Sequence, residues 1–108
     1  MYKKILVPMA LDHDISPRTL AIAQALAGDT GTITALHVYE APKGSVNAYL
    51  DEEAKKDGIA RAKSELLAKT EHLSNVQPVM VIGHTYRTII AYARDNAIDC
   101  IVMGSHRP

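Results

Sequence analysis

Four short apolar segments alternate along the chain with longer segments whose apolar residues recur every three or four positions. A continuous apolar run bounded by polar or turn-forming residues is typical of a strand that is buried on both faces. Recurrence at three or four positions is typical of a helix. The pattern therefore predicts the order β-α-β-α-β-α-β, with strands at residues 3–10, 31–40, 76–83 and 98–104.

The segments between these strands carry signals for where each helix starts and stops. Ser16 and Pro17 suit the cap and first position of a helix, and Gly28 suits its end. In the second helix, Gly58 is a weak helix former and predicts a bend or a later start. The expected helices cover residues 15–28, 47–72 and 85–97.

Alternating strands and helices with such apolar strands predict an α/β fold, an open parallel sheet in the order 3-2-1-4 with helices on both faces. Pro78 cannot donate a ladder hydrogen bond, so it should lie near the start of its strand or at a sheet edge. Ligands of such sheets bind beyond the carboxyl ends of the strands, where the strand order reverses. Residues 9–14 and 104–108 are therefore the candidate site.

Composition narrows the function classes. The 108 residues suit one domain, and 12 Lys plus Arg balance 12 Asp plus Glu, so no net field attracts nucleic acid or an anionic membrane. The single cysteine, Cys100, excludes an internal disulfide, and its expected burial argues against a redox role. With no secretion signal or membrane-length apolar run, we expect a cytoplasmic protein that neither inserts into membranes nor binds nucleic acid.

Candidate chemistry gathers after the fourth strand. Gly104 has no Cβ, so a phosphate or sugar can approach its backbone, and Ser105, His106 and Arg107 add hydrogen-bond donors. The alternative is that Gly104 only ends a strand. Asp12 suits either a nucleotide-linked magnesium ion or a helix cap.

The histidines favour structural roles. His37 lies within the second strand and is expected to be packed and hydrogen-bonded, while His84 and Thr85 are expected to cap the third helix. The remaining histidines lack the spacing of a zinc site, and neither common glycine-rich nucleotide motif, G-x-x-x-x-G-K-[ST] or G-x-G-x-x-G, occurs.

Four stretches, in this order, resemble the universal stress protein family: "KKILVPM", "ALHV", "IG" leading into "TIIAYA", and "DCIVMGSH". The resemblance covers residues 1–108. It implies a Rossmann-like sheet of five parallel strands, frequent homodimers, and in many members ATP bound against the glycine-rich turn after the fourth strand. Against that pattern, the 108-residue domain is expected to lack the last helix and the fifth strand.

The resemblance also implies a nucleotide site. Backbone groups of Val38 would bind adenine, and the walls would come from the ends of the first and fourth strands. The chain departs from the family at Ala10, where an acidic residue is usual, and at Arg107, where a second glycine is usual. The implied site residues are Pro8, Met9, Ala10, Asp12, His37, Val38, Met103, Gly104, Ser105, His106 and Arg107.

Three functions follow from these expectations. The first is a stress-response module that binds ATP, with Mg²⁺ as a companion ion, and acts through its conformation, a homodimer or a regulatory protein partner. The alternative is an interaction module of the same fold that binds no nucleotide. A slow ATP hydrolase or self-phosphorylating enzyme ranks last, because the sequence offers no defined base or nucleophile, so no catalytic residue is predicted.

Overall fold

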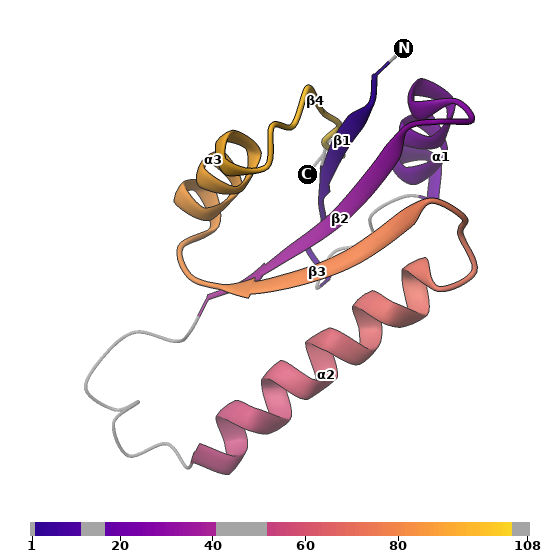
Figure 1. The fold of residues 1–108 in the computed structure, drawn as a ribbon. Coiled ribbons are helices and arrows are strands. Elements are labelled where there is room, and N and C mark those ends of the chain that lie inside the picture. Colours follow the sequence, from indigo (N-terminus) through magenta and orange to yellow (C-terminus); the bar gives the residue numbers. More distant parts are fainter. Residues whose placement is uncertain (1, 12–16, 41–51, 105–108) are drawn as a thin grey trace.

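The computed structural model describes residues 2–11, 17–40 and 52–104. They form a four-stranded sheet in the order β3-β2-β1-β4, in which every pair of neighbouring strands is parallel (Figure 1). The predicted fold class, strand order and alternation of elements are confirmed.

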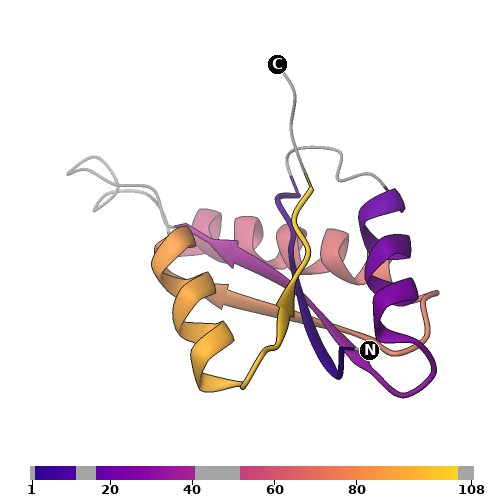
Figure 2. The same cartoon turned by 90° about the horizontal axis from the view of Figure 1, so that it is seen from above.

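Three helices cover the sheet. The strands are β1 (Lys4–Pro8), β2 (Thr32–Tyr39), β3 (Val76–Ile82) and β4 (Cys100–Ile101). The helices are α1 (Pro17–Ala27), α2 (Glu52–Thr70) and α3 (Thr85–Asp95). Figure 2 shows α1 and α2 on one face of the sheet and α3 on the other.

The core divides into two layers because successive strand residues face opposite sides of the sheet. Ile5 and Val7 of β1 join the layer beneath α1 and α2, whereas Leu6 joins Ile89 in the layer beneath α3. All three β1 side chains are fully buried. The central strand therefore fixes both helical layers at once.

The ends of α1 agree with the sequence signals. The helix begins at Pro17, and Gly28 follows its last residue with a positive φ of 64°, a conformation that glycine adopts without steric cost. Ser16, the expected cap, lies outside the described residues.

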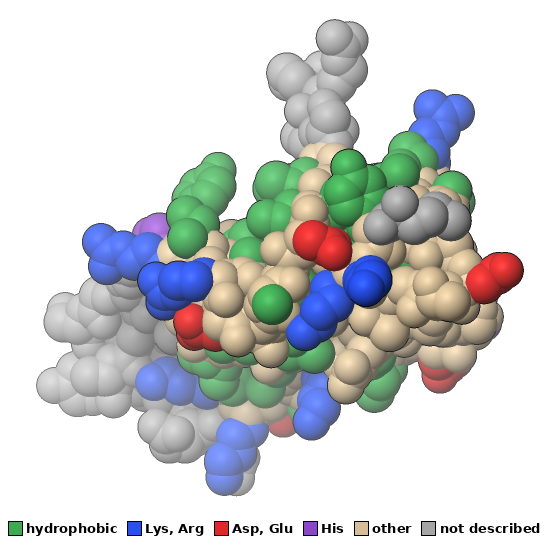
Figure 3. Space-filling view, turned by 45° about the horizontal axis from the view of Figure 1, so that its top comes forward, with side chains coloured by type: hydrophobic (Ala, Val, Ile, Leu, Met, Phe, Trp, Pro, Cys, Tyr) green, Lys and Arg blue, Asp and Glu red, His purple; other side chains and the backbone are tan. Residues whose placement is uncertain are grey.

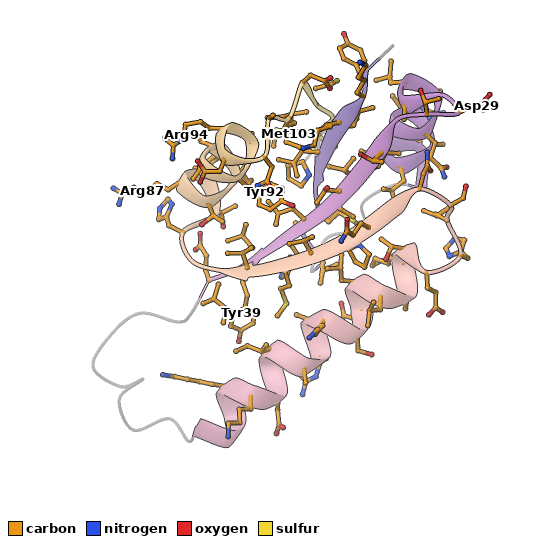
Figure 4. All side chains as sticks on the ribbon, in the orientation of Figure 1. Asp29, Tyr39, Arg87, Tyr92, Arg94 and Met103 are labelled. Atoms are coloured by element: carbon orange, nitrogen blue, oxygen red, sulfur yellow. The ribbon has the colours of Figure 1, made fainter. Side chains whose placement is uncertain are left out.

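Helix α2 corrects the expectation for Gly58. The helix continues through Gly58 without a break and ends at Thr70, two residues short of its predicted end. A Cβ on Gly58 would lie 2.6 Å from the hydroxyl oxygen of Tyr39. The glycine thus makes room for a β2 side chain, which Figure 4 shows pointing toward α2.

The two outer strands of the described sheet are less buried than predicted. No residue of β3 is fully buried, and Pro78 lies in this edge strand, as expected. Strand β4 is confined to Cys100–Ile101 rather than residues 98–104, and Cys100 is half-buried. Among the described residues, each of these two strands has only one neighbouring strand.

A carboxylate fastens the short β4 to the central strand. Asp99 accepts hydrogen bonds from the backbone N–H groups of Lys3 and Lys4, each at 3.1 Å, and its own N–H donates to the Lys4 carbonyl at 2.9 Å.

Over the described ranges, no helix combines the length and apolar character needed to cross a membrane.

Helix α3 ends in a turn that requires a positive φ. Ile98 N–H donates to the Ala93 carbonyl at 2.9 Å, and Ala97, between them, has a φ of 53°. This is the geometry of a Schellman turn, in which glycine is the usual residue at the left-handed position. Ala97 therefore carries steric strain that a glycine would not.

We predict that Ala97→Gly raises the free energy of unfolding by about 0.5–1 kcal/mol, because it relieves this strain. Urea denaturation of both proteins measures the change. The matched control is Asn75→Gly, at a φ of 55°, where the Asn75 side chain donates to the Gly31 carbonyl at 3.1 Å. That substitution should bring no gain, and a destabilised Ala97→Gly protein would contradict the prediction.

Candidate functional site

The carboxyl ends of the parallel strands meet at one edge of the sheet. Figure 2 shows the last described residues after β4 beside the end of β1, and Val102 N–H donates to the Leu6 carbonyl at 2.9 Å. In open parallel sheets this edge is where ligands bind. The strand order 3-2-1-4 places its reversal at β1, as the sequence predicts.

Pairing between β1 and β2 stops at Pro8, which lies opposite Leu36. One residue further on, Met9 N–H still donates to the Leu36 carbonyl at 2.8 Å. The Met9 carbonyl, however, lies 2.7 Å from Nδ1 of His37. A carbonyl can only accept, so Nδ1 carries the proton, and the predicted hydrogen-bonded role of His37 is confirmed.

Val38 brings backbone groups to this edge. Alternate β2 residues direct their N–H and C=O groups toward β1, as the bonds of Thr32 to Lys3 and of Met9 to Leu36 show. By this alternation Val38 also faces the β1 side, beyond the last paired residue. None of the described backbone hydrogen bonds outside the strand ladders involves Val38.

The side chains of two predicted site residues belong to the core. Met9 is 4% exposed and packs in the layer beneath α1 and α2, and Val38 is 8% exposed in the layer beneath α3. Both can therefore offer only backbone groups to a ligand. Pro8 is half-buried and Ala10 exposed at the end of β1.

The segment after β4 is open to solvent. Met103, labelled in Figure 4, is 59% exposed, and Gly104 is exposed as well. The other predicted residues, Asp12, Ser105, His106 and Arg107, lie outside the described residues. Within the described ranges, no three His, Cys, Asp or Glu side chains converge as metal ligands would.

The start of α3 is capped by a residue that the sequence analysis missed. His84 occupies the N-cap position, but its side chain makes no capping hydrogen bond. Instead, the Glu40 carboxylate accepts from the backbone N–H of Thr85 at 2.8 Å and from the Thr85 hydroxyl. His84 thus takes the expected N-cap position, but the capping hydrogen bond expected of its side chain is wrong, because the Glu40 carboxylate at the end of β2 accepts from Thr85 instead.

This cap has a consequence for ligands. The N-terminus of a helix attracts anions through its unpaired N–H groups and its dipole. At α3 the negative charge of Glu40 already occupies that position. The Glu40 carboxylate would therefore repel a phosphate group at the start of α3.

A sheet of this order, with helices on both faces, is a Rossmann-like α/β fold. The model of the universal stress protein family matches residues 1–108. The chain belongs to the universal stress protein family, so the resemblance in the sequence is confirmed. A search of curated protein sequences finds no significant relative.

Solved structures share the fold. The hypothetical protein MJ0577, the subject of a structure-based assignment of biochemical function, is 26% identical with a TM-score of 0.80; the match covers 100% of this chain and 78% of that one. UspA from Lactobacillus plantarum is 24% identical with a TM-score of 0.77, over 99% and 81%. Rv1636 from Mycobacterium tuberculosis is 19% identical with a TM-score of 0.69, over 97% and 72%. The family match, together with this shared fold, supports a stress-response protein.

We predict that Glu40→Ala lowers the free energy of unfolding by about 1–2 kcal/mol, because α3 loses its cap and a compensating charge. Urea denaturation at neutral pH measures the loss. Glu40→Gln is the matched control, since it keeps an oxygen acceptor without the charge, and should lose less. Equal stability of the Ala variant and the wild-type protein would contradict the assignment of the cap.

Proposed function

We propose that this member of the universal stress protein family is a cytoplasmic stress-response module that binds ATP between the ends of β1 and β4. The observation that carries the proposal is the position of Val38. Its backbone N–H and C=O face the side of β1 after the β1–β2 pairing has ended. A flat ligand with one donor and one acceptor would pair with the N–H and C=O of Val38 in place of a further β1 residue.

Adenine has such an edge. Its amino group donates and the neighbouring ring nitrogen accepts, so it matches the carbonyl and the N–H of one strand residue. Pro8 lies opposite Leu36 at the end of β1, and its half-buried ring offers an apolar surface for the base. The residues present therefore fit the base of an adenine nucleotide.

The phosphates would lie after β4. Gly104 is exposed and has no Cβ, so the backbone there is accessible to a phosphate. We expect Ser105, His106 and Arg107 to add donors and positive charge. When bound, Mg²⁺ would neutralise part of the phosphate charge, and Asp12 is the proposed protein ligand, because Ala10 carries no carboxylate.

Binding rather than catalysis is the proposed role. His37 donates Nδ1–H to the Met9 carbonyl, so that nitrogen is not available as a base. Nucleotide binding would then act through the conformation of the segments that follow β1 and β4. We expect these segments to communicate with a second copy of the chain in a homodimer or with a regulatory protein.

A nucleotide-independent interaction module is the second candidate. It is favoured by exposed apolar side chains on α3 and β4: Tyr86 is 70% exposed, Ile90 65% and Ile101 44%. Figure 3 shows hydrophobic side chains gathered over this part of the surface. Surfaces of this kind commonly mark protein contacts.

Calorimetric titration with ATP and Mg²⁺ separates the two candidates. We predict that the wild-type protein binds ATP and that Gly104→Val abolishes detectable binding, because a branched side chain blocks the approach of the phosphates. Gly104→Ala is the graded control and should weaken binding less. Circular dichroism should show both variants folded, since Gly104 is exposed. No detectable ATP binding by the wild-type protein would remove the first candidate and favour the second.

A further inference from the structure

We infer that His37 is a positioning residue for the nucleotide: it ends the β1–β2 ladder by taking the Met9 carbonyl, and so keeps the backbone of Val38 available to the base. The inference rests on the proposed function, because it concerns the same site. It assigns His37 no contact with the phosphates and no proton transfer.

The hydrogen-bond pattern of a parallel ladder identifies the backbone donor whose place the imidazole takes at the Met9 carbonyl. A strand residue that donates to one partner carbonyl accepts from the N–H two residues further along the partner strand. Met9 donates to Leu36 at 2.8 Å, so in a continued ladder its carbonyl would accept from Val38. Instead, Nδ1 of His37 lies 2.7 Å from that carbonyl.

The donor is held firmly in place. His37 pairs with Met80 of β3, so its backbone is fixed by the sheet on the side away from β1. The side chain is half-buried, and the Met9 side chain beside it is 4% exposed in the core. The imidazole thus reaches the Met9 carbonyl from a rigid strand rather than from a loop, which is the arrangement that positions a binding group accurately.

The hydrogen bond determines which chemistry could replace it. Nδ1 must be protonated to donate, and both the neutral Nδ1–H form and the imidazolium satisfy this. Any side chain that places an N–H group one bond beyond Cγ should serve. Asparagine does so, whereas leucine is similar in size to asparagine and has no donor. The substitutions His37→Asn and His37→Leu therefore form a matched pair.

The test is calorimetric titration of the full chain with ATP and Mg²⁺. His37→Asn should stay within about threefold of the wild-type affinity, and His37→Leu should bind about tenfold more weakly, because Val38 then pairs with the freed Met9 carbonyl. Thermal unfolding of both variants verifies that they are folded. A folded His37→Leu protein that binds ATP as tightly as the wild type would overturn the inference and leave the proposed function intact.

Two NMR measurements test the same hydrogen bond without nucleotide. Nitrogen-15 spectra of the wild-type ring should show a proton on Nδ1 at neutral pH, and amide exchange at Val38 should become slower in His37→Leu than in the wild type. A wild-type ring protonated only at Nε2, or faster exchange at Val38 in the Leu variant, would refute the role of His37. Failure of the wild-type protein to bind ATP would instead overturn the proposed function, and this role with it.

Discussion

Strand β1 is buried on both faces and paired along both edges, and this burial holds the two core layers and the neighbouring strands in place. Ile5, Leu6 and Val7 are fully buried, with β2 on one side and β4 on the other. Asp99 fastens the start of the strand through two backbone N–H groups. Because β1 cannot shift along its neighbours, the point at which its pairing ends is also fixed, and the candidate site begins at that point.

The site that follows from this constraint is built mainly from backbone. The side chains of Met9 and Val38 are committed to the two core layers, so their contribution at the sheet edge is through N–H and C=O groups. The Glu40 carboxylate places a negative charge at the start of α3, so this helix start repels an anion. Fold and site are therefore linked through the same few strand residues.

The alternation of apolar strands with helices was sufficient to predict the strand order. Pro17 and Gly28 predicted the start and end of α1, because both act through local backbone geometry. Gly104 was identified as a candidate site residue from its place after the fourth strand and its missing Cβ, and Val38 from the family resemblance. The pattern did not reveal that Gly58 accommodates Tyr39, or that Glu40 caps a helix 45 residues later. Both depend on contacts between segments that are distant in the sequence, which a local pattern does not encode.

If the backbone of Val38 completes its hydrogen bonding with an adenine base, the amide resonance of Val38 should report the bound nucleotide. In nitrogen-15 spectra recorded during titration with ATP and, separately, GTP, we predict a saturable shift of the Val38 amide with ATP. GTP should leave it nearly unmoved, because the corresponding edge of guanine presents its donor and acceptor in the opposite order. A Val38 amide that stays in place while ATP saturates the protein would contradict the account.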